Sequence, residues 1–355
     1  MKSRKIEEKR TSTRTSRGHG GVRILSKRLM TALLNVRSNA RTIALLATVV
    51  CALLLMSGVD ERVMHPYEAR PHSYSRSVIR ECHPDPTHGM GHTFEARVRG
   101  VNVSFAAWTR NQTNERDVVA LRTHEAVRIM GKLKRAGTLL DVGANIGKVT
   151  FPTLAMAQTH TVIAVEPVGV NLDQLCMTAN LNGWLGHAGF LLLKAAMSDR
   201  AGSIEIFVPE GREDNSALNE AAAVANVGKA EHGEVVDVVV GDTVLREGGF
   251  KPDLIKIDTQ GHELHVLRGL KKYLSQAKAR EVLVMAESDP KLMHISGVDP
   301  KEIYQLMVVE LGYKAYCRPT VDVEDEQFVV KGTPLSRREY PPGGCRDIFY
   351  FKSRR

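Results

Sequence analysis

Short apolar runs alternate with segments of helical spacing from residue 137 onward. The runs read TLLDVG, HTVIAVEP, FLLLKAAMSD, PDLIKID and EVLVMAES, and segments such as VNLDQLCMTANLN and GHELHVLRGLKKYL separate several of them. Nearly continuous apolar runs of this length are typical of parallel strands that are covered on both faces. Their alternation with helices predicts a doubly wound α/β sheet.

Two further strand patterns flank this region. FEARVRG and VNVSFAAW alternate polar with apolar residues and predict a hairpin, and DIFYFK near the C-terminus is a strong strand former because of its aromatic and β-branched residues. NERDVVALRTHEAVRIMGKLKRAG has apolar residues at helical spacing and predicts a helix that ends near its last glycine. Residues 320–344 hold an acidic cluster and PPGG, so we expect them to lie outside the core.

The N-terminal part of the chain has a different character. The run TIALLATVVCALLLMSGV at 42–59 has no charged side chain and is long enough to cross a hydrocarbon core of about 30 Å as a helix. Twelve Lys and Arg residues precede it against two Glu residues, which predicts a single-pass anchor with a cytoplasmic N-terminus and a luminal domain in the Golgi or endoplasmic reticulum. The predicted organisation is a basic tail at 1–41, the anchor, a stem at 60–95 and a folded domain at 96–355.

Other interpretations of the N-terminus stay open. A cleaved secretory signal usually has shorter basic and apolar regions, whereas residues 1–41 share the Arg/Ser/Thr-rich, acid-poor composition of organelle transit peptides. Glycosylation sequons begin at Asn102 and Asn111 and fit a luminal domain. The basic leader accounts for the formal net charge of +9, so this charge gives no reason to expect a nucleic-acid partner. The histidines of the stem lack the spacing of known metal sites, and no metal is expected.

The cysteines fit the same compartment. Cys51 lies in the apolar run, whereas Cys317 and Cys345 both adjoin predicted strands near the C-terminus. In an oxidising compartment we expect these two to form a disulfide. The alternative is that they remain free thiols together with Cys82 and Cys176.

The stretch DVGANIG follows a predicted strand and opens a predicted helix. Gly143 and Gly147 lack a Cβ atom, so the backbone can approach a ligand closely. With Asn145 between them the pattern is neither the G-x-G-x-x-G of dinucleotide-binding folds nor a P-loop. Asp141 before the turn suits the ammonium of an amino-acid tail, and Glu166 ends the next strand, where a carboxylate can bind both ribose hydroxyls. The combination predicts S-adenosylmethionine as the cofactor.

Five short motifs occur in order along the chain. They are DVGANIG at 141–147, AVEP at 164–167, AMSDRAG at 196–202, KIDTQGHE at 256–263 and VMAE at 284–287. Over about residues 100–352 the sequence resembles the FkbM-type methyltransferases, a Rossmann-like class that uses S-adenosylmethionine. The resemblance implies a seven-stranded sheet whose antiparallel strand is DIFYFK. It also implies methylation of hydroxyl groups, often on sugars or polyketides, and it adds Ser198 to the predicted cofactor residues.

Two positions depart from the expected pattern. The family usually has an acid where this chain has Gln260, which puts the role of that acid in doubt. Pro152 lies a turn or more into the helix expected after the glycine turn. In a regular helix a proline there removes a hydrogen bond at a cost of about 3 kcal/mol, so we expect a kink.

The candidate catalytic residues lie at the ends of the later strands. Asp258 and Glu287 end the fourth and fifth predicted strands, at the carboxyl edge where open α/β sheets bind ligands, and either can serve as a base or a substrate anchor. His262 follows Gly261 at a predicted helix start, whose dipole favours a neutral, basic imidazole; the alternative is a surface histidine. Glu263 is expected to be an ordinary first-turn acid.

The sequence therefore predicts a membrane-anchored, S-adenosylmethionine-dependent O-methyltransferase that acts on a hydroxyl-bearing acceptor such as a glycan. Gln260 motivates an alternative, a degenerate domain that binds the cofactor or a partner without turnover. An NAD-dependent enzyme is disfavoured because G-x-G-x-x-G is missing.

Overall fold

The computed structural model describes most of the chain from residue 124 onward and parts of the preceding region. The described residues are 82, 92–98, 101–107, 124–157, 159–209, 216–217, 232–279 and 281–353. Every described residue belongs to one compact unit, which spans 69–355.

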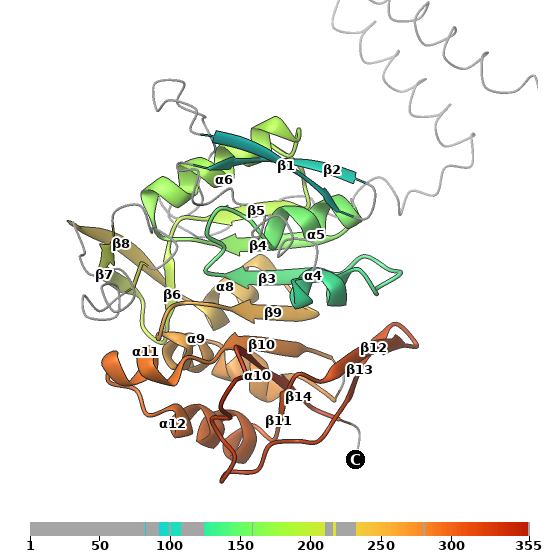
Figure 1. Ribbon diagram of the computed structural model, residues 1–355, viewed down its shortest axis with the longest axis vertical. Coiled ribbons are helices and arrows are strands. Elements are labelled where there is room, and N and C mark those ends of the chain that lie inside the picture. Colours follow the sequence, from blue (N-terminus) through green and yellow to red (C-terminus); the bar gives the residue numbers. More distant parts are fainter. Residues whose placement is uncertain are drawn as a thin grey trace, which may run out of the picture. The chain divides into compact units, whose positions relative to one another are not determined.

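A seven-stranded sheet runs through this unit in the order β11-β14-β10-β9-β3-β4-β5 (Figure 1). Its strands are β3 (Thr138–Val142), β4 (Thr161–Val165), β5 (Phe190–Leu193), β9 (Leu254–Ile257), β10 (Leu283–Glu287), β11 (Lys314–Cys317) and β14 (Asp347–Phe351). Pairing is antiparallel only where β14 meets β10 and β11, so β14 alone runs against the others. The predicted doubly wound sheet is confirmed, with DIFYFK as its antiparallel strand.

Alternate residues of the strands face two separate hydrophobic clusters, which is why the apolar runs are nearly continuous. Leu139 belongs to one cluster and Leu140 to the other. The Leu139 cluster includes residues of the hairpin β1 (His92–Val98) and β2 (Val101–Ala107), of α4 (Glu125–Met130), of α5 (Thr150–Met156) and of α6 (Gly169–Leu181). The Leu140 cluster includes residues of α8 (Gly241–Gly248), α9 (Glu263–Gly269), α10 (Lys271–Gln276), α11 (Pro290–Ile295), α12 (Pro300–Tyr304) and the following π-helix η4 (Gln305–Glu310).

The run FLLLKAAMSD was expected to be one strand, but it is divided between two sheets. Leu193 ends β5, whereas β6 (Ala196–Ser198) pairs with β8 (His232–Val240), which also pairs with β7 (Gly202–Val208). Figure 1 shows this small sheet near the edge to which the arrowheads of β3, β4, β9 and β10 point. Because residues on both sides of the bend are buried, the apolar pattern does not mark it.

The expectation that residues 320–344 lie outside the core is wrong in part. They contain the hairpin β12 (Thr320–Glu324) and β13 (Gln327–Lys331). Val321 and Phe328 are buried against the Leu139 cluster, and Tyr340 is buried against the Leu140 cluster. The acidic turn between the strands is exposed, so a small number of apolar side chains anchors a mostly polar segment.

The expectation that Pro152 lies a turn or more into the helix is wrong. The chain makes a turn over 145–149 after Gly143, and α5 begins only at Thr150, so Pro152 lies in the first turn of the helix. The N–H groups of Phe151 and Thr153 donate to the carbonyls of Gly147 and Val149, and proline, which has no N–H, interrupts this series of bonds. The kink stays a prediction.

Several predictions fall on residues outside those described. They include the apolar run at 42–59, most of the stem and the sequon at Asn111. The helix expected to end near Gly137 is seen only as α4, which ends at Met130. Within the described part of the chain, no helix is long and apolar enough to cross a membrane.

Two disulfides join distant parts of the described chain. Cys317 and Cys345 are paired as expected, with a Cα–Cα distance of 5.9 Å, and this bond connects the end of β11 to the residue pair preceding β14. Cys82 and Cys176 form the second bond, at a Cα–Cα distance of 5.2 Å, and fix residue 82 to α6. The alternative of four free thiols is therefore wrong.

The first of these disulfides is expected to stabilise the domain substantially. Closing its separation of 28 residues restricts the unfolded chain by about 3–4 kcal/mol. The double variant Cys317→Ser, Cys345→Ser should therefore lose about that much free energy of unfolding, measured by urea denaturation without reductant. Untreated wild type serves as the comparison, and an unchanged urea midpoint in the double variant would contradict the expectation.

Candidate active site

The turn after β3 is held against two neighbouring strands. Gly143 has a φ of 75°, and its N–H and that of Ala144 both donate to the carbonyl of Val165 at the end of β4. A Cβ atom on Gly143 would overlap the main-chain oxygen of Asp258, which follows β9. Glycine is therefore required here by both backbone conformation and close approach.

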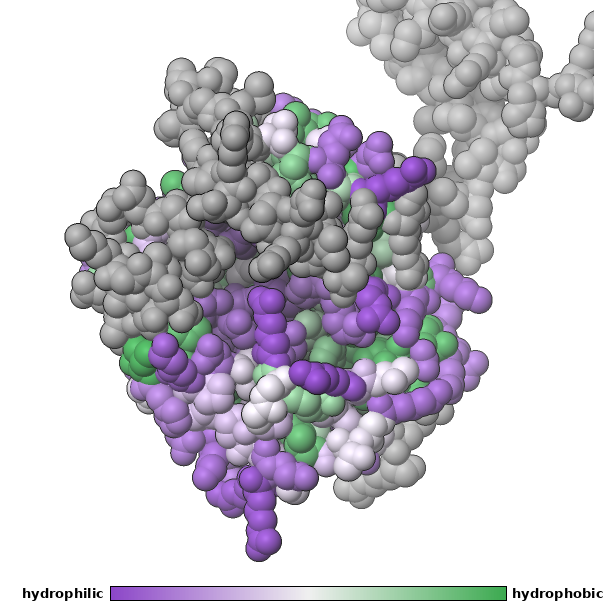
Figure 2. Space-filling view, viewed as in Figure 1, coloured by the Kyte–Doolittle hydropathy of each residue, from purple (hydrophilic) through white to green (hydrophobic). Residues whose placement is uncertain are grey.

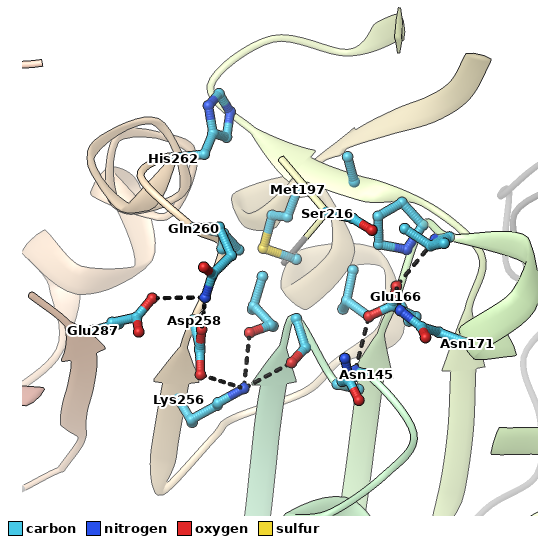
Figure 3. Close-up of a pocket in the computed structure, with 18 of the residues that line it drawn as sticks. Asn145, Glu166, Asn171, Met197, Ser216, Lys256, Asp258, Gln260, His262 and Glu287 are labelled. Atoms are coloured by element: carbon cyan, nitrogen blue, oxygen red, sulfur yellow. Dashed lines mark hydrogen bonds and ion pairs between the residues drawn. The ribbon is translucent and has the colours of Figure 1, made fainter. Parts of the chain in front are cut away.

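Asn145 continues the same turn with a φ of 52°, a left-handed conformation that asparagine tolerates better than most residues. Its N–H donates to Oε2 of Glu166 over 2.8 Å. The other carboxylate oxygen of Glu166 accepts from the N–H of Val168 at 3.1 Å and from Nδ2 of Asn171 at 3.2 Å. Burial raises the pKa of Glu166, and these hydrogen bonds oppose the shift. Figure 3 shows Glu166 between Asn145 and Asn171.

Lys256 on β9 is a buried cation beneath this turn. Its Nζ donates to the carbonyl of Gly143 at 2.7 Å and lies 3.9 Å from Oδ2 of Asp258 (Figure 3). It also lies 3.3 Å from Oδ1 of Asp141. Burial opposes its charge, but the two carboxylates outweigh that effect and raise the pKa of the Lys256 ammonium. Asp141 also accepts a hydrogen bond from the Thr150 hydroxyl at 2.7 Å. This network therefore fixes the turn to the start of α5.

Gln260 bridges the two candidate carboxyl groups. Its Nε2 donates to Oδ1 of Asp258 at 3.0 Å and to Oε2 of Glu287 at 3.1 Å (Figure 3). Burial and the neighbouring Asp258 raise the pKa of Glu287 to about 10. Burial opposes ionisation of Asp258 too, but Lys256 and the hydrogen bonds from Glu287 and Gln260 hold its pKa below the usual range. At neutral pH the pair is therefore one carboxylate and one carboxylic acid.

His262 lies apart from this pair in the close-up, toward β6 (Figure 3). Its Nε2 is 3.0 Å from Oγ of Ser198, and its ring stacks on that of His265 with centroids 4.5 Å apart. Burial and the neighbouring His265 lower the pKa of His262 to about 4. The imidazole is neutral, as expected, but burial rather than the helix dipole is the main cause, and a group with this pKa is a weak base.

Glu263 has a larger role than that of the ordinary first-turn acid expected from the sequence. Its Oε1 accepts from the N–H and hydroxyl of Thr259 at 2.9 and 3.1 Å and from the N–H of Gly261 at 3.2 Å. The carboxyl group thereby closes the turn that carries Gln260. This turn places the bridging amide between Asp258 and Glu287.

A cavity of about 510 Å³ brings most of the predicted residues together. Gly143, Asn145, Glu166, Asp258, His262 and Glu287 line it, whereas Asp141, Gly147 and Ser198 do not. Asp141 supports the turn through Lys256, Gly147 packs closely against Phe151, and Ser198 contacts His262. Direct cofactor contacts by these three residues stay predictions.

Four lining or supporting residues were not singled out from the sequence: Lys256, His124, Arg346 and Asn171. His124 precedes α4, and its Nδ1 accepts from the N–H of Ala126 at 3.3 Å. Burial and Lys256 lower its pKa to about 4, so its ring is neutral. Lys256 was detectable because it lies within the motif KIDTQGHE, but His124 and Arg346 carry no local pattern and reach the site only through the fold.

The protonated state of Glu287 predicts a pH-dependent effect on stability. The folded state retains a proton that an unfolded glutamate releases above its pKa of about 4.3, so this group destabilises the fold progressively as pH rises toward 10. Glu287→Gln keeps the shape and stays neutral. We expect this variant to unfold at a higher temperature than wild type, and the difference should grow from pH 5 to pH 8. Each kcal/mol of added free energy of unfolding corresponds to roughly 2–4 °C.

The control for this measurement is Glu324→Gln, since the side chain of Glu324 is 54% exposed and the variant loses only a surface ion pair with Lys331. Thermal unfolding of the three proteins at several pH values makes the comparison. A pH-independent difference between Glu287→Gln and wild type would show that Glu287 is ionised in the folded state.

The cavity extends across the carboxyl ends of four adjacent strands, from β4 to β10. Its β3–β4 half has a glycine turn, a buried carboxylate and apolar walls, and its β9–β10 half has the paired carboxyl groups. The sheet order, with the cavity at the carboxyl edge of its parallel strands, is a methyltransferase-like fold. Residues 141–315 match the model of the Methyltransferase FkbM domain, and this domain of the chain belongs to that family.

The chain is also similar to individual proteins. The chain is 29% identical over 199 residues to hexuronic acid methyltransferase AglP of Haloferax volcanii, a match that covers 56% of this chain and 70% of that protein. Among solved structures, it is 14% identical to methyltransferase FkbM of Methylobacillus flagellatus, with a TM-score of 0.34, covering 67% of this chain and 55% of that one. It is 16% identical to TYW2 of M. jannaschii in complex with AdoMet, with a TM-score of 0.36, covering 74% and 87%.

The family assignment confirms the predicted cofactor, S-adenosylmethionine. The residues present fit it. The cavity volume lies in the range of small-molecule sites. Each carboxylate oxygen can accept two hydrogen bonds, so Glu166 retains one unused acceptor position, on Oε2, because Oε1 already accepts from Val168 and Asn171. Val142, Ala144 and Met197 supply apolar lining beside it.

Proposed function

We propose that the chain is an O-methyltransferase that transfers a methyl group from S-adenosylmethionine to a hydroxyl group of a glycan or another small acceptor. The observation that carries the proposal is the carboxylate and carboxylic acid pair in the β9–β10 half of the cavity, beside the half that fits the cofactor. A hydroxyl nucleophile must lose a proton during methyl transfer, and a positioned carboxylate can accept it.

Asp258 is the residue we assign as the base. It is anionic at neutral pH, its side chain is 24% exposed and lines the cavity, and Lys256 and Gln260 fix its position. When bound, S-adenosylmethionine supplies an electrophilic methyl group on its sulfonium sulfur. Asp258 accepts the proton of the acceptor hydroxyl, and protonated Glu287 donates its one O–H to Asp258 and so supports that carboxylate. Gly143, Asn145 and Glu166 hold the cofactor side of the cavity.

The glycan acceptor is supported by the relative from Haloferax volcanii, whose name states that it methylates a hexuronic acid. The paired carboxyl groups are consistent with a polar, hydroxyl-bearing ligand in this half of the cavity. In the coloured part of the face in Figure 2, hydrophilic side chains surround patches of hydrophobic ones.

The alternative function is a domain that binds the cofactor without turnover, and Gln260 motivates it. In the structure Gln260 occupies a position between two acidic groups that are both retained. The amide therefore organises the pair rather than removing it, which favours turnover.

An assay with S-adenosylmethionine and a pool of glycans separates the two functions. We expect formation of S-adenosylhomocysteine that depends on the glycan pool. Cofactor binding without any S-adenosylhomocysteine over the whole pool would support the non-catalytic domain and contradict the enzyme.

We also propose the location inferred from the sequence: a basic tail at 1–41, an anchor at 42–59, a stem at 60–95 and a luminal methyltransferase domain at 96–355. Two disulfides support an oxidising compartment, and Asn102 of the first sequon is exposed on β2. Endoglycosidase should then increase the mobility of the expressed protein, and intact vesicles should protect the domain from added protease. Unchanged mobility together with degradation of the domain would contradict this location.

A further inference from the structure

Arg346 is a cation at the cavity that the proposed reaction does not use. It lines the cavity immediately before β14, on the side of the sheet that is remote from Asn145 and Glu166. Strands β10, β9 and β3 lie between β14 and β4, the strand that Glu166 follows. Its place in the sheet therefore puts Arg346 at the β9–β10 half of the cavity, where the proposed function places the acceptor.

The backbone of Arg346 is held from several directions. Its carbonyl accepts from the N–H of Ser288 over 2.7 Å, and the next residue, Asp347, is paired with Glu287 in the sheet. Cys345 on its other side is bonded to Cys317, and Arg318 donates to the carbonyl of Gly344 at 2.6 Å. Arg346 is exposed, but its backbone is fixed on both sides, so its side chain extends from a defined position at the cavity.

The guanidinium of Arg346 has N–H donors that no hydrogen bond within the described residues uses. Within the described residues it makes no hydrogen bond or ion pair, although it lies close enough to lower the pKa values of Asp258, Glu287 and Asp347. Asp258 is already paired with Lys256, and Glu287 is protonated. The positive charge of Arg346 is therefore not cancelled by a direct partner, and its planar fork of N–H donors suits a carboxylate.

We propose that Arg346 binds a carboxylate on the acceptor, so that the preferred acceptor is a uronic-acid-type sugar rather than a neutral one. The inference rests on the proposed function, because it assigns the acceptor of the same site. One guanidinium balances one carboxylate, whereas a dianionic phosphate would leave excess negative charge beside Asp258. The disulfide between Cys317 and Cys345 keeps this recognition residue in place.

Binding without turnover tests the proposal. The full-length protein in detergent, with S-adenosylhomocysteine present, is titrated by NMR with methyl glucuronoside, methyl glucoside and glucose 6-phosphate. We expect wild type to bind the glucuronoside about tenfold or more tightly than the glucoside, and Arg346→Gln to lose that preference. Arg346→Lys should restore part of it, because the charge returns without the bidentate fork. Arg337→Gln is the matched control, since Arg337 is an exposed arginine that does not line the cavity.

Three results would overturn the proposal. They are equal or undetectable binding of glucuronoside and glucoside by wild type, an unchanged preference in Arg346→Gln, and tighter binding of the phosphate sugar. Weaker S-adenosylhomocysteine binding by Arg346→Gln, to the same degree as glucuronoside binding, would assign the guanidinium to the cofactor and also contradict it. The proposed function fails by a different result, the absence of methyl transfer, so the two failures are distinguishable.

Discussion

Asp258→Asn is expected to lower the rate of methyl transfer by about 100- to 10,000-fold, the range for loss of a positioned general base. The amide cannot accept the proton, yet it is nearly the same size and can still accept a hydrogen bond from Gln260. Lys256 keeps Asp141 as its partner, so the fold is retained. Single-turnover rates, with cofactor affinity measured by calorimetry, make the test.

The comparison variant is Glu287→Gln, which keeps the shape of the other carboxyl group and resembles its protonated state. It should lose much less activity than Asp258→Asn, because Glu287 is neutral in the folded protein. Rates for Asp258→Asn within threefold of wild type would contradict the assignment of the base. Equal losses in both variants would show that the two carboxyl groups act as one unit.

Gly143→Ala is the second change with a large expected effect. A methyl group at this φ of 75° is strained, and it would also overlap the main-chain oxygen of Asp258. The turn after β3 and the end of β9 must then move apart. This displaces both the turn that lines the cofactor side of the cavity and the proposed base, Asp258. We expect cofactor affinity to fall by at least about 100-fold, equivalent to roughly 2.7 kcal/mol, measured by calorimetry.

Gly183→Ala is a matched control for this variant. Gly183 has a φ of 70°, but a Cβ atom there would meet nothing within 4 Å. It therefore carries the same backbone strain, about 1–2 kcal/mol of stability, without the clash. If both variants bind the cofactor as wild type does, the close approach of Gly143 to Asp258 is not needed for the site.

The central sheet could be predicted from the sequence because each of its parallel strands is buried on both faces. Leu139 and Leu140 show why: both are fully buried, in different clusters, so the run has no polar interruption. The bend between β5 and β6 could not be predicted for the same reason, because residues on both sides of it are buried and apolar. The hairpin β12–β13 was missed because Val321 and Phe328 are isolated apolar residues in a polar segment, and only contacts with the distant core bury them.

The cavity was predictable where a motif carried its residues. The glycine turn, Glu166, Asp258 and Glu287 all end or follow strands, so their common location follows from the parallel sheet. Arg346 was not predictable, because it approaches from the antiparallel strand that enters the sheet last in the chain. The sequence also could not show that Gln260 joins the two acids, since that contact depends on the turn closed by Glu263.

The most direct test of methyl transfer to oxygen uses S-adenosylmethionine labelled with ¹³C in its methyl group. The protein is incubated with a pool of uronic-acid-containing and neutral glycans, and the products are examined by NMR. We predict that wild type transfers the label to an oxygen-bound methyl group and that Asp258→Asn does not. Label bound to nitrogen or carbon, or no transfer by a protein that binds the cofactor, would contradict an O-methyltransferase.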